Sequence, residues 1–425
     1  MVKVHARAGF QIRNWASNDP EVLAKIGATD PATIKDFAVN KESGFERLLG
    51  LIWFPEKDVF SCSLKSLDAV QELILGEVVP TKRDLLRVVM SIYDPLGLVA
   101  PFVVHGKVLV QDVWRSGVGW DTMIPADIHK RWMGWIEVLR KMEGVQISRC
   151  YFPGYDPVSY ERLELHIFVD ASEQAFSAVA YFRIVDRGLV RCTIVASKTK
   201  VAPLKTLTIP KLELMAAVIG ARLRKKIQEN HSLEICRTVF WSDTSTVISW
   251  IKSDVRRYRQ FVAFRVNEIL ILSSADEWRW TPTHLNVADE ATKWGKGPSF
   301  EFDCRWFRGM EFLYDEETEW PEDHREPVKQ TEEELRPAYI CKHFVIEPLL
   351  NPGRFSKWER LLRCVAYMHR FTENLKSLIK NKPLLNGELT SEELKMAERT
   401  LWKMAQSDSY PDEVTILKHN TLVTA

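Results

Sequence analysis

The sequence predicts an α/β protein in which a mixed five-stranded sheet is flanked by helices. Between residues 160 and 312 the hydrophobic pattern alternates in the order β-β-β-α-β-α-α-β-α. Three meandering strands therefore precede two strands that return through helices, which makes a mixed sheet with helices packed on it. An N-terminal α+β segment and a helical C-terminal tail are expected to complete the chain.

The composition limits the classes of protein to consider. A chain of 425 residues, with 46% hydrophobic and 27% charged residues, is expected to form two or three soluble globular domains. Its net charge of +1 means that any nucleic-acid footprint must be local. The 7 cysteines show no CxxC spacing and indicate reduced thiols inside the cell, without structural zinc. No signal peptide is expected, and the most apolar stretch, broken by Pro101, is too short to span a bilayer.

The first 150 residues are expected to hold a hairpin and three helices. An apolar strand through Trp53, a Pro-Glu-Lys-Asp turn and an alternating strand from Val59 predict the β-hairpin. Pro80 and Thr81 are start signals for a helix that stops at Asp94–Pro95. Two further helices are predicted over 105–120 and 125–142, and their Trp and Leu side chains are assigned to core packing.

The alternating region contains the elements that define the sheet. The expected strands are 163–170, 176–184, 189–198, 236–243 and 277–282, and the expected helices are 209–230, 244–253, about 257–272, and 286–294 closed by Gly295. The acidic, proline-containing segment from Tyr314 to Pro337 predicts a solvated linker. Beyond it, 355–378 and 390–406 predict amphipathic helices capped by Ser356 and Ser391.

Four carboxylates are predicted to meet at one edge of the sheet. Asp170 and Asp243 end two strands that are expected to lie side by side. Glu213 is placed in the first turn of helix 209–230 and off its buried stripe, and Asp289 in the first turn of the last helix. Because parallel strands place their carboxyl ends at the same edge, these side chains are expected to converge there.

Each carboxylate taken alone also has a structural explanation. Asp170 could form a turn, Asp243 could cap the next helix, and Glu213 and Asp289 could favour helix dipoles. Four together repel one another and raise each other's pKa, so the arrangement makes sense only if cations bind. Hard divalent ions such as Mg²⁺ are the candidates. Two ions roughly 4 Å apart would activate a water and stabilise the leaving oxygen in phosphodiester cleavage.

The combination "HIFVDAS…IPKLELMAA…FWSDTSTV…NVADEATKWG" closely resembles the ribonuclease H domain of BEL/Pao-type long-terminal-repeat retrotransposons. The resemblance implies a ribonuclease H-like fold and a catalytic metal-ligand set of Asp170, Glu213, Asp243 and Asp289. It further implies two Mg²⁺ ions, with Mn²⁺ as an alternative, and hydrolysis of the RNA strand of RNA/DNA hybrids during reverse transcription.

The resemblance extends across nearly the whole chain. It implies a reverse-transcriptase palm/thumb-like remnant at 1–75, a helical connection at 76–152, the ribonuclease H-like domain at 153–312, an acidic linker at 313–340 and a helical pre-integrase region at 341–425. No Tyr-x-Asp-Asp motif occurs, so polymerase activity is not expected. The chain is expected to be an internal slice of a polyprotein. Its partners would be the palm and integrase, and its place a cytoplasmic virus-like particle or the nucleus, with no membrane.

Two further groups of residues are candidates for the site. Many ribonucleases H carry a mobile histidine before the last ligand, and His284 occupies such a loop, although its spacing is short; an exposed loop histidine is the alternative. A basic stretch with interleaved aromatic residues suits phosphate contacts to a hybrid duplex, or else forms a solvated helix face. Its candidate nucleic-acid-binding residues are Lys252, Arg256, Arg257, Arg259 and Arg265.

Two rival functions remain open. "SDTST" resembles the Asp-Thr-Gly motif of aspartic peptidases, but Ser245 replaces the glycine and no flap-like hairpin follows. The stronger rival is a truncated or domesticated remnant that binds nucleic acid without cutting it. Metal-dependent cleavage of a labelled RNA strand in a hybrid separates these hypotheses.

Overall fold

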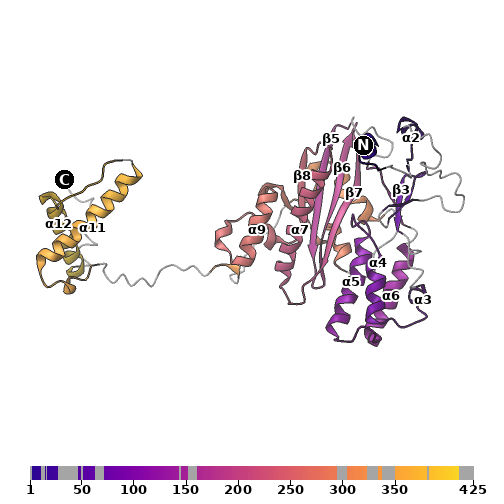
Figure 1. The fold of residues 1–425 in the computed structure, drawn as a ribbon, viewed down its shortest axis with the longest axis horizontal. Coiled ribbons are helices and arrows are strands. Elements are labelled where there is room, and N and C mark those ends of the chain that lie inside the picture. The colour runs from indigo at the N-terminus through magenta and orange to yellow at the C-terminus, as the bar shows by residue number, and fades with distance from the viewer. Residues whose placement is uncertain are drawn as a thin grey trace. The chain divides into compact units, whose positions relative to one another are not determined.

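The protein is described by a computed structural model (Figure 1). Two compact units divide the chain, Met1–Arg336 and Pro337–Ala425. The structure describes residues 2–10, 15, 17–26, 46–48, 51–62, 71–142, 145–151, 160–293, 304–322, 334–336, 350–380 and 382–410. Gly295, the predicted helix stop, lies outside these ranges.

A mixed five-stranded sheet forms the centre of the first unit, in the order β7-β6-β5-β8-β9 (Figure 1). Its strands are β5 (Arg162–Ala171), β6 (Ala175–Asp186), β7 (Leu189–Val201), β8 (Arg237–Ser242) and β9 (Trp278–Trp280). β5, β6 and β7 pair antiparallel, whereas β8 runs parallel to both β5 and β9. The predicted fold class is confirmed, including three meandering strands followed by two that return through helices.

One face of the sheet is covered by helices that follow β7 in the sequence. These are α7 (Ile209–Asn230), α8 (Ser245–Ile251) and α9 (Gln260–Leu272). Their apolar side chains share a core with those of β5, including Ile167 and Val169. At Gly220 of α7 an added Cβ would lie 2.7 Å from Val169 Cγ1. Glycine therefore allows α7 to approach β5 closely, which positions the start of this helix beside the end of the strand.

The opposite face is covered by helices that precede the sheet. These are α4 (Lys82–Ser91), α5 (Ala100–Arg115) and α6 (Ala126–Met142); the short α10 (Arg305–Arg308), which follows the sheet in the sequence, contributes to the same core. Trp132 and Trp135 of α6 belong to the same core as Phe168 of β5 and Trp241 of β8. Thr81 caps α4 in a capping box with Asp84, as its start signal predicted. The connecting helices thus complete the layered fold of this sheet.

The loop between α4 and α5 ties these helices to the edge strand β7. Gly97 has φ of 71°, and a Cβ there would lie 2.2 Å from the carbonyl oxygen of Ser197. The Ser197 amide donates to the carbonyl of Leu96 at 2.8 Å. Glycine is required here because the backbone is left-handed and touches another backbone.

The predicted N-terminal hairpin is present as β2 (Leu51–Phe54) and β3 (Val59–Cys62). It belongs to a second sheet, β1-β2-β3-β4, whose last strand comes from beyond the connecting helices. Trp53 is buried, and its Nε1 donates to Asp58 Oδ1 at 3.0 Å. The other elements in this part are α1 (Val2–Arg7), α2 (Pro20–Ile26), β1 (Glu46–Leu48), α3 (Gln71–Leu75) and β4 (Gln146–Ser148).

Two predicted helices take a different form. The Arg-rich helix begins at Gln260, after a short 3-10 turn, η2 (Val255–Arg257), where Asp254 accepts from the Arg256 amide at 3.0 Å. The last helix is replaced by 3-10 turns, η4 (Thr283–Leu285) and η5 (Val287–Ala291). The Asn286 side chain accepts from the Ala288 amide at 3.2 Å. In both places a side chain satisfies a backbone group locally and so competes with an α-helix.

The predicted linker is partly folded. Its first residue, Tyr314, ends the 3-10 turn η6 (Glu311–Tyr314), and the segment contains a second turn, η7 (Glu317–Glu319). A further 3-10 turn, η3 (Ala275–Glu277), directly precedes β9. Trp320 is 3% exposed, and Glu334 pairs with Lys211 at 2.6 Å. Residues 314–319 are exposed, in keeping with the prediction, but the burial of Trp320 and the ion pair of Glu334 show that the described part of the segment is not solvated throughout.

The second unit is helical, as predicted, with η9 (Pro352–Arg354), α11 (Trp358–Ile379) and α12 (Ser391–Ser409). The caps differ from the predicted Ser356 and Ser391. Lys357 occupies the cap position of α11, and Thr390 caps α12 in a capping box with Glu393. Among the residues that the structure describes, no helix combines the length and apolarity needed to cross a bilayer.

Candidate metal centre

Strands β5 and β8 place two aspartates at one edge of the sheet. Asp170 lies within β5 opposite Ser177 and is fully buried. The following turn is organised by Ser172, whose Oγ accepts from the amides of Gln174 and Ala175 at 3.2 Å. Asp170 is therefore not the turn residue. Asp243 directly follows Ser242, the end of β8, so the two carboxylates share an edge as predicted.

Asp243 does not cap the helix that follows it. The cap position of α8 is Thr244. Asp243 Oδ1 instead accepts from Asn286 Nδ2 at 3.2 Å, and the same amide nitrogen donates to the Val169 carbonyl at 3.0 Å. Trp280 Nε1 also donates to the Asp243 carbonyl at 3.0 Å. The segment after β9 thus fixes the orientation of this carboxylate.

Glu213 completes a compact group of three carboxylates. It is the fifth residue of α7, just past the predicted first turn, and it is 5% exposed rather than directed away from the core. Ligand oxygens of Asp170, Glu213 and Asp243 all lie within 4.8 Å of one another. Glu213 Oε2 is buried without a hydrogen-bond partner in the described part of the chain. A buried oxygen left in this state points to a missing ligand.

Asp289 joins this group through a lysine. Lys293 Nζ lies 2.7 Å from Asp289 Oδ1 and 3.4 Å from Asp170 Oδ1. Thr292 Oγ1 donates to Asp170 Oδ2. Among the described residues, the compact group itself contains the other three acids and not Asp289. The predicted convergence of four acids is therefore seen as three in direct proximity and a fourth linked by an ion pair.

The electrostatics are those of a site short of positive charge. Burial, followed by the charge of Asp289, raises the pKa of Asp170 to about 8. Burial and the charges of Asp170 and Asp243 raise the pKa of Glu213 well above its usual range. Burial also raises the pKa of Asp289 despite its ion pair with Lys293. The carboxylates in turn raise the pKa of Lys293, although its burial opposes this. Ionising all of these acids together requires additional cations.

The residues fit a hard divalent ion. All donors in the compact group are carboxylate oxygens, the ligands that Mg²⁺ and Mn²⁺ prefer. The unpartnered Glu213 Oε2 supplies an oxygen that only a cation or proton would satisfy in so buried a position. The donor set contains neither thiolate nor imidazole, so it is not that of a structural zinc site.

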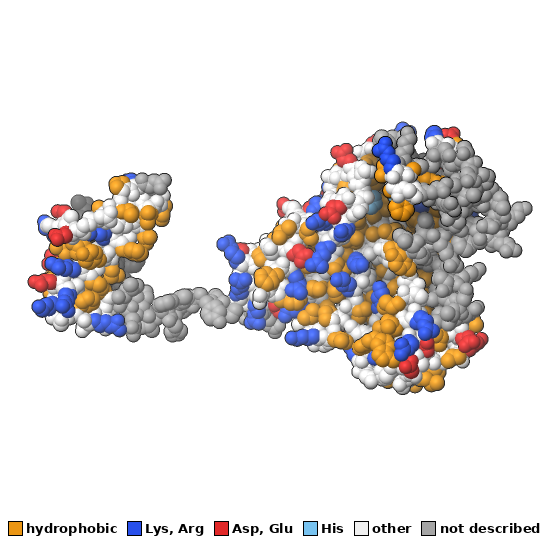
Figure 2. Space-filling view, in the orientation of Figure 1, with side chains coloured by type: hydrophobic (Ala, Val, Ile, Leu, Met, Phe, Trp, Pro, Cys, Tyr) orange, Lys and Arg blue, Asp and Glu red, His pale blue; other side chains and the backbone are white. Residues whose placement is uncertain are grey.

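The basic candidates divide into two kinds. Figure 2 shows Lys and Arg side chains on the surface around α9. Lys252, Arg256, Arg257 and Arg259 are exposed and precede α9. Arg265 lies within α9, half-buried, and its guanidinium stacks 3.5 Å from the centroid of the Phe261 ring. A role for Arg265 in packing therefore has direct support. The other four side chains are exposed, although Arg256 also pairs with Asp254 at 2.9 Å and Arg259 Nε donates to the Leu335 carbonyl at 3.3 Å.

His284 lies in η4 with an exposed side chain, and its backbone carbonyl accepts from Arg305 at 2.9 Å. Sequence analysis missed the residues that organise the carboxylates, namely Asn286, Thr292 and Lys293. Of these, Lys293 had a signal, because it stands four residues after Asp289, the spacing of a helical ion pair.

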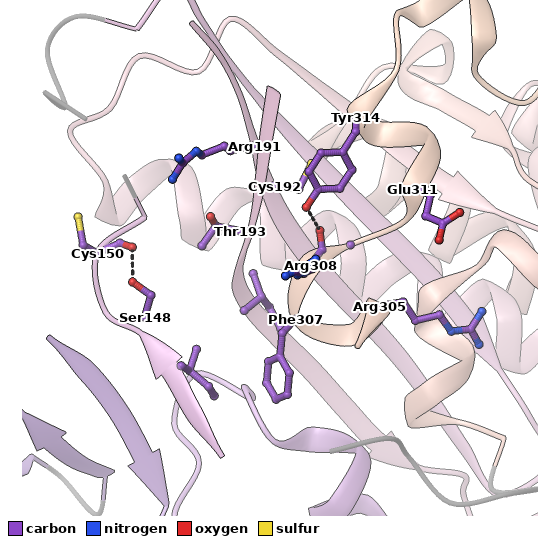
Figure 3. A pocket seen from close by; sticks show the side chains of 13 residues that line it. Ser148, Cys150, Arg191, Cys192, Thr193, Arg305, Phe307, Arg308, Glu311 and Tyr314 are labelled. Atoms are coloured by element: carbon purple, nitrogen blue, oxygen red, sulfur yellow. Dashed lines mark hydrogen bonds between the residues drawn. The ribbon is translucent and has the colours of Figure 1, made fainter. Parts of the chain in front are cut away.

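A cavity of about 720 Å³ lies in the first unit, away from the carboxylates (Figure 3). Residues of β4, β7 and α10 line it, among them Arg191, Arg305 and Phe307. Tyr314 at its wall donates to the Arg308 carbonyl at 3.1 Å. None of the four candidate acids is among its lining residues. The carboxylates therefore form a separate site at the sheet edge.

Comparisons with known proteins found a family model and solved structures that are similar to part of this chain. Residues 81–244 match a family model described as the Pao retrotransposon-like RNaseH-like domain. No curated protein shows a significant match. Among solved structures, the N-terminal RNase H domain of a Mycobacterium tuberculosis protein, fused to maltose-binding protein, is 14% identical. The match covers 31% of this chain and 91% of that one, with a TM-score of 0.23.

RNase H1 from the halophilic archaeon Halobacterium salinarum NRC-1 is 13% identical, with 29% of this chain and 89% of that chain covered and a TM-score of 0.21. The family match begins just before α4 and ends just after β8. It includes the connecting helices as well as Asp170, Glu213 and Asp243. Residues 81–244 are therefore similar to a Pao retrotransposon-like RNase H-like domain.

Proposed function

We propose that this chain is the ribonuclease H of a BEL/Pao-type retrotransposon, an endonuclease that hydrolyses the RNA strand of RNA/DNA hybrids with two divalent ions. Mg²⁺ is the expected ion and Mn²⁺ the alternative. The observation that carries the proposal is the compact group of Asp170, Glu213 and Asp243, with the buried Glu213 Oε2 left without a partner among the described residues.

The acids have distinct places in this proposal. Asp170, Glu213 and Asp243 would hold one ion, and Asp170 with Asp289 would hold the other. When bound, such ions lower the pKa of a water and stabilise the leaving oxygen. Asn286 keeps Asp243 directed into the site by its hydrogen bond of 3.2 Å. Thr292 restrains Asp170 in the same way. These contacts fix the ligands before any ion arrives, which favours binding.

The substrate would be held by charges outside the carboxylate group. Lys252, Arg256, Arg257 and Arg259 present exposed positive charge that can neutralise backbone phosphates. His284, exposed in η4, is proposed to assist proton transfer or product release, as in ribonucleases H that carry a histidine in this loop. Arg265 is not included, because its guanidinium is used in packing.

The proposed context is a retroelement polyprotein. The palm and integrase would be partners of this chain, and the virus-like particle in the cytoplasm, or the nucleus, its place of action. The N-terminal hairpin is assigned to a reverse-transcriptase remnant on resemblance, and polymerase activity is not expected, since the Tyr-x-Asp-Asp motif is missing. The domain limits proposed from the sequence belong to the same hypothesis.

A silent nucleic-acid-binding remnant is the second candidate. One observation favours it: Lys293 already supplies a positive charge to Asp170 and Asp289, which reduces repulsion when no metal is bound. In that case the carboxylates would persist as a folded but inactive group. The two candidates differ in whether cleavage depends on the acids.

The deciding experiment measures cleavage of a labelled RNA strand within a hybrid duplex. Asp243→Asn removes one ligand charge without disturbing the cap of α8, which is Thr244. We expect the Mg²⁺-dependent rate to fall by at least about a hundredfold. Hybrid affinity in Ca²⁺, at matched salt, should change little because the exposed basic residues remain.

The matched control is Asp276→Asn, the same chemical change at an exposed position in η3. It should retain full activity. Cleavage by Asp243→Asn at the normal rate, or metal-independent cleavage by the unaltered chain, would contradict the proposed mechanism. Binding of hybrid without any cleavage would support the silent remnant.

A further inference from the structure

Lys293 divides the carboxylate site into two unequal halves. Its ammonium lies between Asp170 and Asp289, at 3.4 Å and 2.7 Å from one Oδ1 of each. In the described part of the chain it makes no ion pair with Glu213 or Asp243. The half formed by Asp170, Glu213 and Asp243 is therefore open to a cation, while the half formed by Asp170 and Asp289 already contains one.

We propose that Lys293 is a tethered cation that occupies the place of the second divalent ion and must withdraw before that ion can bind. This inference rests on the proposed two-ion site and adds an order of loading to it. The first ion enters the open half. The second competes with an ammonium that is attached to the chain.

The geometry makes competition unavoidable. An ion shared by Asp170 and Asp289 would lie against the same two carboxylates that Lys293 contacts, and two cations so close together repel strongly. Withdrawal is feasible because the Lys293 side chain is 44% exposed, in contrast to Asp170, which is fully buried. A lysine has a long flexible stem, so its head can move to solvent while the backbone stays in place.

Removal of the ammonium should therefore strengthen binding of the second ion. Lys293→Met keeps most of the length of the unbranched side chain and removes its charge. We expect at least a roughly tenfold gain in affinity for the second Mn²⁺, with a smaller change for the first. Lys293→Arg retains the charge and should leave the second ion weakly bound. Lys226→Met, which removes a charge from a lysine that is 75% exposed at the far end of α7, is the remote control.

The measurements do not depend on catalysis. The number of Mn²⁺ ions bound to the chain is measured by calorimetry and by electron paramagnetic resonance, which detects the ion left unbound. Thermal unfolding without and with saturating Mn²⁺ tests whether each variant is folded. Lys293→Met should show a larger rise in Tm on adding Mn²⁺ than either the unaltered chain or Lys293→Arg. Equal or weaker second-ion affinity in Lys293→Met would overturn the role of Lys293 while leaving the two-ion site intact. Absence of bound Mn²⁺ in every variant would overturn the two-ion site and this inference together.

Discussion

Strand β5 carries two buried carboxyl groups whose pKa values are shifted in opposite directions. Glu164 lies near its start and Asp170 near its end, and both are fully buried. Burial alone raises the pKa of any carboxyl group, so each requires compensation. The pKa of Glu164 is lowered to about 2, whereas the pKa of Asp170 is raised to about 8. The same strand thus separates a satisfied acid from an unsatisfied one.

The Glu164 end is satisfied by the chain itself. Arg183 and Arg237 donate to its two oxygens at 3.0 and 2.9 Å. His166 Nε2 lies 3.2 Å away, and because His166 Nδ1 accepts from Trp241, Nε2 is the donor. The hydrogen bond from His166 and the charges of Arg237 and Arg183 outweigh burial and lower the pKa of Glu164. An acid of this kind has a structural role.

The Asp170 end has far less compensation. Its positive neighbour is Lys293, at 3.4 Å and half exposed, and other acids surround it. If these carboxylates served the fold alone, Glu213 Oε2 would be expected to have a hydrogen-bond partner. It is buried and has none among the described residues. The difference between the two ends indicates that a buried acid signals function when its compensation is missing, and that burial alone does not.

The largest expected effect is a difference in the free energy of unfolding between substitutions at the two ends of β5. Glu164→Gln leaves the guanidinium of Arg183, which is 1% exposed, without its counter-charge, and should lower the free energy of unfolding by about 3–5 kcal/mol. Asp170→Asn replaces a buried carboxyl group whose ionisation is unfavourable in the folded protein, so the metal-free protein should keep or gain stability. Urea unfolding in a chelator at neutral pH measures both. Loss of stability in Asp170→Asn equal to that in Glu164→Gln would remove the distinction.

A second prediction uses pH. Because the folded pKa of Asp170 is about 8, above its unfolded value of about 3.9, its contribution to stability is full below that lower value and falls as pH rises to about 8. Glu164 behaves oppositely, since its folded pKa of about 2 lies below its unfolded value of about 4.3. Its contribution is present above that upper value and is lost as pH falls through about 2.

The contribution of Asp170 to the stability of the metal-free protein should therefore fall between about pH 4 and 8, and Asp170→Asn or saturating Mg²⁺ should flatten that slope. Mg²⁺ does so because it binds the ionised acids and replaces the proton. Urea unfolding across this range, with and without the ion, is the measurement. A flat profile for the unaltered chain without metal would show that the acids at the Asp170 end are already compensated.

The arrangement at the Asp170 end of β5 could be predicted from the sequence better than that at the Glu164 end. Asp170 and Asp243 could be predicted because each directly follows a run of apolar strand residues, and parallel strands share an edge. The bounds of the helix that carries Glu213 were predicted correctly, but Glu213 was expected off its buried stripe, because the apolar periodicity does not show that this side chain is buried beside the end of β5. Asp289 was expected on an α-helix, where Asn286 instead favours a 3-10 turn.

The Glu164 end could not be predicted, because its partners are distant in the sequence. Arg183 and Arg237 come from two different strands, and Trp320 comes from a segment whose acidic composition predicts exposure. The ring of Trp320 lies 5.3 Å from the guanidinium carbon of Arg183. The same limit applies to the helices α4 to α6, whose apolar stripes predicted burial but not the face of the sheet that they cover.

The smallest expected effect tests which contacts at the Glu164 end matter. Arg162 Nε lies 3.1 Å from Glu164 Oε1, yet its side chain is 43% exposed. Arg162→Ala should therefore cost no more than about 1 kcal/mol of unfolding free energy, as for other solvent-exposed ion pairs. Arg183→Ala is the matched variant, because Arg183 is buried and also donates to the Leu313 carbonyl at 2.6 Å. It should cost about 3–5 kcal/mol, since it removes a buried charged donor from Glu164 and leaves the Leu313 carbonyl without this hydrogen bond. Equal costs for the two variants in urea unfolding would mean that the number of ion pairs, and not the burial of the partner, sets the stability of this end of β5.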